Sequence, residues 1–223
     1  MELLALEGVS KSYGQGHTLV EALKPTDFRL AAGKFVAIIG PSGSGKTTFL
    51  TILGQLQSPS QGKVLLKRQD TAELSEKERT ALRFDQFGFI LQASNLIPFL
   101  TIQEQFDLID RQSDKEKISQ QDLVTFLDLA SCLKQYPKDL SGGERQRAAI
   151  ARALYNSPDI ILADEPTASL DTERAKRVVH LLRRVTRDYG KSVVMITHDT
   201  RLLDEVDQVY EMQDGSLRLV RES

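Results

Sequence analysis

Residues 40–47 constrain the fold of this chain more than any other stretch. They read GPSGSGKT and match the phosphate-loop pattern G-x-x-x-x-G-K-[ST]. The pattern carries weight only when it follows a strand and opens a helix. The apolar run at 34–39 predicts the strand, and a helical pattern through Leu53, ended by Gly54, predicts the helix. The sequence therefore predicts a phosphate-binding loop at the carboxyl end of a buried strand.

The residue types in this loop suit a bound nucleoside triphosphate. Glycines let backbone N–H groups close around phosphates, and the helix that follows adds the positive end of its dipole. Lys46 can reach the β- and γ-phosphates, and the Thr47 hydroxyl can ligate Mg²⁺. The alternative, a plain Gly/Ser turn, leaves the complete motif unexplained. The expected nucleotide contacts are Gly40, Pro41, Ser42, Gly43, Ser44, Gly45, Lys46, Thr47 and Thr48.

Short apolar runs alternate with helical patterns, which predicts an α/β fold with a largely parallel sheet. Two further buried strands are expected at 160–163 and 193–197, with a helix at 172–189 between them. A C-terminal hairpin is expected around Asp214 and Gly215. Shorter, partly exposed strands are expected at 3–6, 28–30 and 64–66.

Helical patterns replace strand patterns between about residues 96 and 136. Thr101 and Glu104 form a predicted capping box that opens one helix there. We therefore expect one domain over residues 1–223, with a core at about 1–92 and 156–223 and an inserted helical subdomain at about 93–155.

Composition excludes several classes of function. The net charge of −2 and pI of about 6.0 give no general affinity for nucleic acid. No apolar run approaches the ~20 residues of a membrane span, and the N-terminus lacks a basic signal region. A single cysteine, Cys132, excludes an internal disulfide and is expected to be a buried thiol. A cytoplasmic protein is predicted, held at a membrane only through a partner.

Two carboxylates follow the buried strand at 160–163. Asp164 would lie beside the phosphate loop, where it suits a Mg²⁺ partner. Glu165 is the next residue and is placed to accept a proton from an attacking water. Acids that merely begin a turn are the alternative, and the phosphate loop earlier in the chain argues against it.

Two more polar residues follow predicted strands. His198 comes directly after the strand at 193–197, at the sheet edge where parallel folds bind ligands, and could contact a γ-phosphate or the attacking water. Gln92 closes the short strand 87–91 and could ligate Mg²⁺ and orient water. A polar residue that simply ends a strand is the alternative for Gln92.

A second glycine-rich helix start lies at residues 140–147, LSGGERQR. Ser141 and Glu144 form a capping box, so a well-capped helix is the simplest interpretation. That interpretation does not explain Gly142 and Gly143, each of which costs up to ~1 kcal/mol against alanine. Exposed N–H groups at a helix N-terminus bind anions, which indicates a second phosphate contact.

In order and spacing, these motifs resemble those of the nucleotide-binding subunits of ABC transporters, over essentially the whole chain. The LSGGERQR stretch resembles the family signature, and residues 160–166 resemble the Walker B strand. The resemblance assigns Gln92 to the Q-loop, His198 to the switch position and Asp171, in Ser169-Leu-Asp171, to the D-loop. Tyr13, in the segment SKSYG, matches the aromatic residue that stacks on adenine.

The resemblance implies a P-loop (RecA-like) ATPase core, an N-terminal antiparallel β-subdomain and an inserted α-helical signature subdomain. It implies an ATPase that uses ATP and Mg²⁺ and pairs head to tail as a homodimer. Ser141 and Gly143 of each subunit then contact the γ-phosphate held by the other. A membrane permease would dock near residues 92–100, from Gln92 to Leu100, on the inner face of the plasma membrane. The core of the helical subdomain is the alternative for any one apolar side chain there.

Details of the motifs resemble one branch of the family. LADEPTASLD, at 162–171, is similar to the macrolide-exporter and lipoprotein-release branch. GFILQ, NLIP and MITHDTRL resemble the ATPases of bacterial haem-efflux pumps. The expected function is to power export of a substrate such as haem, a macrolide or a peptide-like antimicrobial.

Two other classes share the signature. The DNA-repair type needs a coiled coil or zinc modules, and the translation type needs two such domains, neither of which this sequence contains. A cell-division or lipoprotein-release ATPase would drive a membrane partner without moving a substrate across the membrane. This last class stays open.

Overall fold

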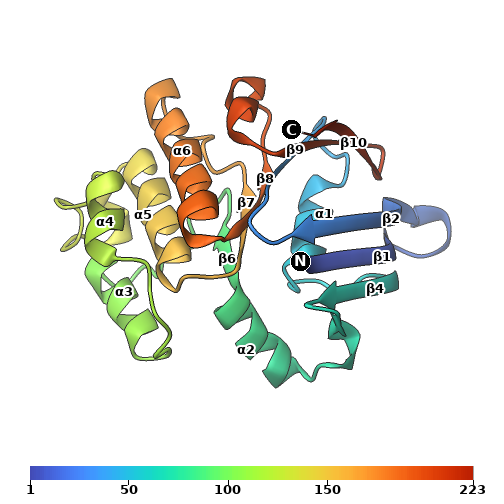
Figure 1. The fold of residues 1–223 in the computed structure, drawn as a ribbon, viewed down its shortest axis with the longest axis horizontal. Helices are drawn as coiled ribbons and strands as arrows, with labels where there is room; N and C mark the ends of the chain where they lie inside the picture. The colour runs from blue at the N-terminus through green and yellow to red at the C-terminus, as the bar shows by residue number, and fades with distance from the viewer. Residues whose placement is uncertain (223) are drawn as a thin grey trace.

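The computed structural model describes residues 1–222. Their strands form two sheets, and the helix α1 (Lys46–Leu53) packs between them (Figure 1). The first sheet is antiparallel, in the order β2-β1-β4-β5. Its strands are β1 (Glu2–Tyr13), β2 (Val20–Ala31), β4 (Gln61–Leu66) and β5 (Gln69–Asp70).

The second sheet has the order β10-β9-β3-β8-β7-β6. All its pairs are parallel except β10 with β9, so the predicted parallel core and C-terminal hairpin are confirmed. In its middle, Ala37 of β3 faces Met195 of β8 on one side and Val209 of β9 on the other. Its strands are β3 (Phe35–Ile39), β6 (Phe87–Ile90), β7 (Ile160–Asp164), β8 (Ser192–Ile196), β9 (Gln208–Gln213) and β10 (Ser216–Glu222).

The N-terminal strands are partly exposed, as predicted, but are longer than the short segments expected at 3–6 and 28–30. β1 and β2 each run for 12 residues, and their inward side chains are fully covered. Leu4, Leu23 and Leu30 have no exposed surface. These side chains are covered because α1 packs against the inner face of this sheet, where the three elements form a hydrophobic core.

The predicted helices are present, with capping residues that explain where they begin. Thr101 accepts a hydrogen bond from the Glu104 N–H at the start of α3, and Gly190, at φ 64°, ends α6. The helix α2 was not predicted. The α-helices are α1 (Lys46–Leu53), α2 (Glu76–Gln86), α3 (Ile102–Asp110), α4 (Gln120–Phe126), α5 (Gly142–Tyr155) and α6 (Thr172–Tyr189). Four short 3-10 helices are η1 (Gly16–Thr18), η2 (Thr71–Glu73), η3 (Pro137–Asp139) and η4 (Thr200–Glu205).

The six-stranded sheet separates two hydrophobic cores. Because successive side chains of a strand point to opposite faces, Ala37 joins the core under α3 to α6, while Val36 and Ile38 join the core under α1, β1 and β2. Cys132 is fully buried in the first of these cores, as predicted. Both faces of β3 are therefore buried, and the loop that follows β3 starts from a firmly packed strand.

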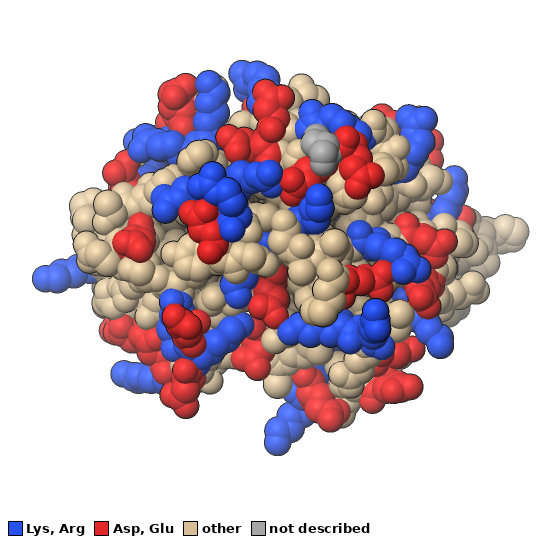
Figure 2. Space-filling view, viewed as in Figure 1, with Lys and Arg blue, Asp and Glu red and all other residues tan. Residues whose placement is uncertain are grey.

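Charged side chains of both signs are interspersed over the face drawn in Figure 2. Ion pairs in the structure include Arg183 with Asp207 at 2.9 Å and Lys67 with Asp159 at 2.8 Å. Within residues 1–222, no helix is both long enough and apolar enough to cross a membrane.

Candidate active site

The phosphate loop joins β3 to α1 and is shaped by close backbone approaches. Gly40 has φ +146°, and a Cβ there would overlap the carbonyl of Met212 in β9. Gly45 has φ +103°, and a Cβ there would overlap the carbonyl of Ala22 in β2. Both positions therefore require glycine, for conformation and for space. The loop therefore packs closely against two strands that are far apart in the sequence, β2 and β9.

Lys46 lies inside this loop, with its ammonium group on the loop's own carbonyls. Its Nζ donates to Gly40 O at 2.8 Å and to Pro41 O at 2.6 Å. Burial lowers the pKa of Lys46, while the nearby carboxylates of Glu165 and Asp164 act in the opposite direction. A cation in this position can pair with phosphate oxygens that enter the loop.

The carboxyl end of β7 brings Asp164 to the first turn of α1. The Thr47 hydroxyl donates to Asp164 Oδ2 at 3.1 Å, and Asp164 is buried. A hydroxyl beside a carboxylate is a donor set that suits Mg²⁺, which prefers oxygen ligands. These two residues fit the metal that was predicted for them.

Glu165 and His198 face each other across the ends of β7 and β8. His198 Nε2 lies 3.0 Å from Glu165 Oε1, and the Glu165 N–H donates to the carbonyl of Ile196. Burial raises the pKa of the Glu165 carboxyl, while His198 acts to lower it. A carboxylate with a raised pKa next to a phosphate loop is suited to accept a proton.

Two other predicted residues lie at the margins of this cluster. The Tyr13 hydroxyl, at the end of β1, lies 3.5 Å from Thr48 Oγ1 in α1. Gln92 is exposed and follows β6, whose Ile90 pairs with Ala163 of β7. Gln92 thus leaves the sheet at the same edge as Asp164 and Glu165.

The signature residues form a separate helix start. Ser141 Oγ accepts a hydrogen bond from Glu144 N at 3.3 Å, and Ser141 N donates to Glu144 Oε2 at 2.8 Å, so the capping box is present. A Cβ at Gly143 would make only ordinary contacts, the nearest 3.5 Å from Leu170 Cδ2. At Gly142 the nearest atom would be 3.9 Å away. The fold of this chain therefore does not require either glycine.

The structure does not join the two glycine-rich helix starts into one site. The helix α1 packs among β1, β2, β7 and β8, whereas α5 packs against α3, α4 and β6. No hydrogen bond links residues 40–48 to 141–144 within the part of the chain that the structure describes. Asp171 accepts from Arg174 N at 2.9 Å and caps α6.

The C-terminal hairpin supports the phosphate loop, a role that its sequence does not indicate. Gly215 N donates to Ser44 O at 3.0 Å, and Gly215 O accepts from Lys24 N at 2.9 Å. The Asp-Gly turn signal predicted the hairpin, but nothing in its local sequence indicates which loop it touches.

A P-loop followed by a carboxylate-ended strand and a second, glycine-rich helix start defines an ATPase of the ATP-binding cassette class. A family model described as "ABC transporter" matches residues 23–168, and the chain belongs to that family as an ABC ATPase. It is 43% identical over 220 residues to the "Putative hemin import ATP-binding protein HrtA" of Staphylococcus haemolyticus (strain JCSC1435), covering 97% of this chain and 99% of the relative.

A second relative and a solved structure agree with this assignment. The protein of the same name from Staphylococcus aureus (strain bovine RF122 / ET3-1) is 43% identical, covering 96% of this chain and 98% of the relative. The dimeric ATP-binding cassette MJ0796, solved in a post-hydrolysis state with ADP and Pi, has a TM-score of 0.90 and 35% identity and covers 99% of this chain and 100% of that one.

Proposed function

We propose that this chain is the ATP-hydrolysing subunit that powers export of haem, or of a similar amphipathic substrate, through a separate membrane permease. The observation that carries the ATPase part is the cluster of Lys46, Thr47, Asp164, Glu165 and His198 at one sheet edge. The substrate rests on the hemin proteins among the relatives and on the motifs at 88–98 and 195–202.

In the proposed reaction, Lys46 and the loop N–H groups bind the phosphates, and Tyr13 stacks on the adenine. Thr47, Asp164 and Gln92 would hold Mg²⁺, which would offset negative charge on the phosphate oxygens. Glu165 accepts a proton from the attacking water, and His198, whose Nε2 lies 3.0 Å from Glu165 Oε1, orients that water or the γ-phosphate.

Two copies of the chain are proposed to complete each site. Gly142 and Gly143 are free of close neighbours within their own chain, so their small size suits an approach from outside. The solved dimer of MJ0796 supports this arrangement. In a C₂ dimer, Ser141, Gly143 and Glu144 of one subunit face the nucleotide of the other, with Asp171 beside the boundary.

The permease is proposed to dock at residues 92–100, on the inner face of the plasma membrane. This segment has one side in the core and one outside, because Leu96 is 9% exposed and Phe99 is 75% exposed. The segment leads from the core into the helical subdomain, for which we propose the bounds 93–155. Motion there would pass between permease and nucleotide.

Direction and substrate can be tested together. The chain would be reconstituted with the permease encoded beside its gene, in vesicles that expose the ATPase to the medium. Addition of ATP is expected to load haem into these vesicles, and the Glu165→Gln complex should not load them. Haem that leaves preloaded vesicles instead would establish import, the direction in the relatives' printed names.

A result without haem movement would favour the second candidate, a cell-division or lipoprotein-release ATPase. The motif at 162–171 supports that class as well as the exporters. For that class we expect the permease to stimulate ATPase activity while no substrate crosses the membrane.

The raised pKa of Glu165 predicts a pH dependence of turnover. A general base acts only when it is deprotonated, and a raised pKa keeps the carboxyl protonated to a higher pH. We expect kcat for ATP hydrolysis to fall as the pH is lowered, with the midpoint above that of an ordinary glutamate. A kcat–pH profile at saturating ATP measures this. A midpoint in the ordinary range would show that Glu165 is not the group that titrates.

A further inference from the structure

Tyr13 is accessible to a ligand, yet its hydroxyl is fixed. The residue ends β1 and is 40% exposed. Its phenol O–H donates to Gln57 Oε1 at 2.7 Å, in addition to its approach to Thr48. The ring can therefore offer a face to a ligand while its polar end is held in place.

One face of the Tyr13 ring is already occupied. The ammonium group of Lys11 lies over the ring, 5.4 Å from its centroid, in a cation–π arrangement. The same ammonium group donates to Ser58 O at 2.7 Å. Lys11 thus covers one face of the ring, and the opposite face is the one left for a flat base.

Gln57 and Ser58 belong to the segment between α1 and β4, residues 54–60, here named the α1–β4 linker. Gln57 is anchored to α1, because its N–H donates to Thr51 O at 3.3 Å and its Oε1 also lies 3.4 Å from Thr51 Oγ1. The helix α1 begins at Lys46. The orientation of Tyr13 is therefore tied to the helix that opens the phosphate site.

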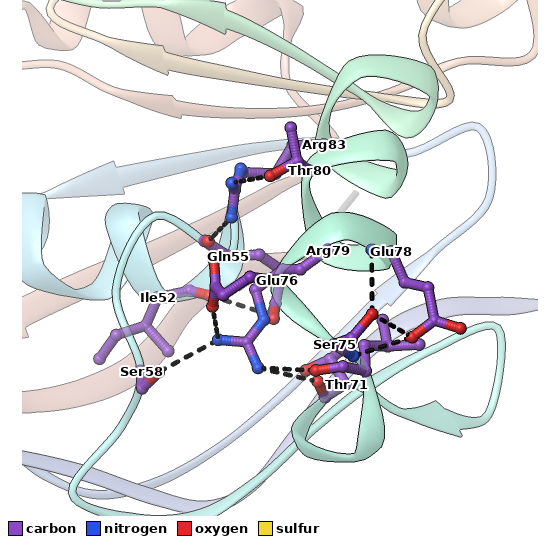
Figure 3. Close-up of polar contacts among 11 residues, drawn as sticks. Ile52, Gln55, Ser58, Thr71, Ser75, Glu76, Glu78, Arg79, Thr80 and Arg83 are labelled. Atoms are coloured by element: carbon purple, nitrogen blue, oxygen red, sulfur yellow. Dashed lines mark hydrogen bonds and ion pairs between the residues drawn. The ribbon is translucent and has the colours of Figure 1, made fainter.

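The helix α2 holds the linker from its other side, as Figure 3 shows. Arg83 donates to Gln55 O at 2.8 Å, and Arg79 donates to Ser58 Oγ at 3.4 Å. Gln55 is buried and has φ +57°, a backbone conformation that residues other than glycine seldom adopt. The linker lies between Tyr13 and α2 and has contacts on both sides, which restrict its movement.

We infer that Gln57 is a positioning residue for nucleotide binding. It fixes the Tyr13 hydroxyl so that the ring, covered by Lys11 on one face, stacks on a purine base with the other. The inference rests on the proposed contact between Tyr13 and the base. Gln57 should therefore affect the affinity for the base and leave the affinity for the phosphates unchanged, because the phosphates bind to the loop at 40–48.

Binding of ADP and of inorganic pyrophosphate to the full chain, measured by calorimetry, tests this role. Gln57→Ala is expected to raise the Kd for ADP about threefold to tenfold, the usual worth of one hydrogen bond. The Kd for pyrophosphate should not change. Tyr13→Phe should give the same increase, and the double variant should add nothing. Gln57→Glu keeps the acceptor and should bind ADP like the unmodified chain, as should the control Gln61→Ala, an exposed residue of β4.

Each other outcome overturns the inference in a distinguishable way. Equal weakening of ADP and pyrophosphate in Gln57→Ala would show a structural role in the phosphate loop. Additive effects of Gln57→Ala and Tyr13→Phe would show that Gln57 does not act through the hydroxyl. If Tyr13→Ala weakens ADP binding but Gln57→Ala does not, only the positioning role fails. If Tyr13→Ala leaves ADP binding unchanged, the proposed base contact fails with it.

Discussion

Replacement of Glu165 by Gln is expected to slow ATP hydrolysis by about 10²–10⁴-fold, the rate enhancement that a general base usually contributes. ATP binding should stay intact. Gln keeps the size of the side chain and removes the group that accepts the proton. The side chain can keep its place 3.0 Å from His198. With ATP present, the variant should accumulate as a nucleotide-bound dimer, since the step that opens the dimer is blocked.

Steady-state ATPase assays and gel filtration with and without ATP measure the two effects. Glu2→Gln is the matched control, because it removes a carboxylate paired with Arg29 at 2.6 Å, in the antiparallel sheet. Near-normal turnover in Glu165→Gln would remove Glu165 from the role of base.

Replacement of Gly143 by Leu is expected to abolish dimer closure and ATP hydrolysis while a monomer still binds ATP. A Cβ at this position fits within the chain, so the fold should survive. The larger side chain would project at the start of α5, where a nucleotide of the partner is proposed to bind. Calorimetric ATP binding by the monomer serves as the control for folding.

Mixing this variant with Lys46→Ala tests whether the two subunits share their sites. In a mixed dimer both defects fall on one composite site, and the other site has an intact phosphate loop and an intact signature. Random pairing should then restore about a quarter of the normal rate, since half of the dimers are mixed and each has one competent site. Mixtures that recover no activity would contradict exchange across the dimer.

The sequence predicted the parallel core well because its strands are buried on both faces. Such strands read as continuous apolar runs, as at 34–39 and 193–197, and are easy to recognise. The helix α6 has clear ends, with Asp171 as its cap and Gly190 in the left-handed conformation.

The elements that were missed or underestimated lack a regular apolar period. The pairing of β1 with β2 shifts register between Leu6 and Val9, which breaks the alternation that marks a strand. The helix α2 has no buried residue, so no apolar stripe predicts it. Its one signal is the capping box of Ser75 and Glu78, in which Ser75 N donates to Glu78 Oε2 at 2.8 Å.

The same contrast holds within the site. Motif residues such as Asp164 and Glu165 lie at the carboxyl end of a strand, so their positions follow from the topology alone. Gln57 meets Tyr13 only because β1 and α1 pack together, and those residues are 44 positions apart in the chain. Contacts of this kind depend on tertiary packing and leave no local pattern to read.

The place of β3 in its sheet bears on how the protein is made. Its neighbours in the sheet are β8 and β9, which lie more than 150 residues later, between Ser192 and Gln213. A ribosome releases β3 early, and the apolar strand must then wait, unpaired, while most of the polypeptide is synthesised. The phosphate loop, which follows β3, therefore gains its surrounding sheet only late in synthesis. Chains that lack β8 and β9 would leave this apolar strand exposed and would be targets for chaperones and proteases.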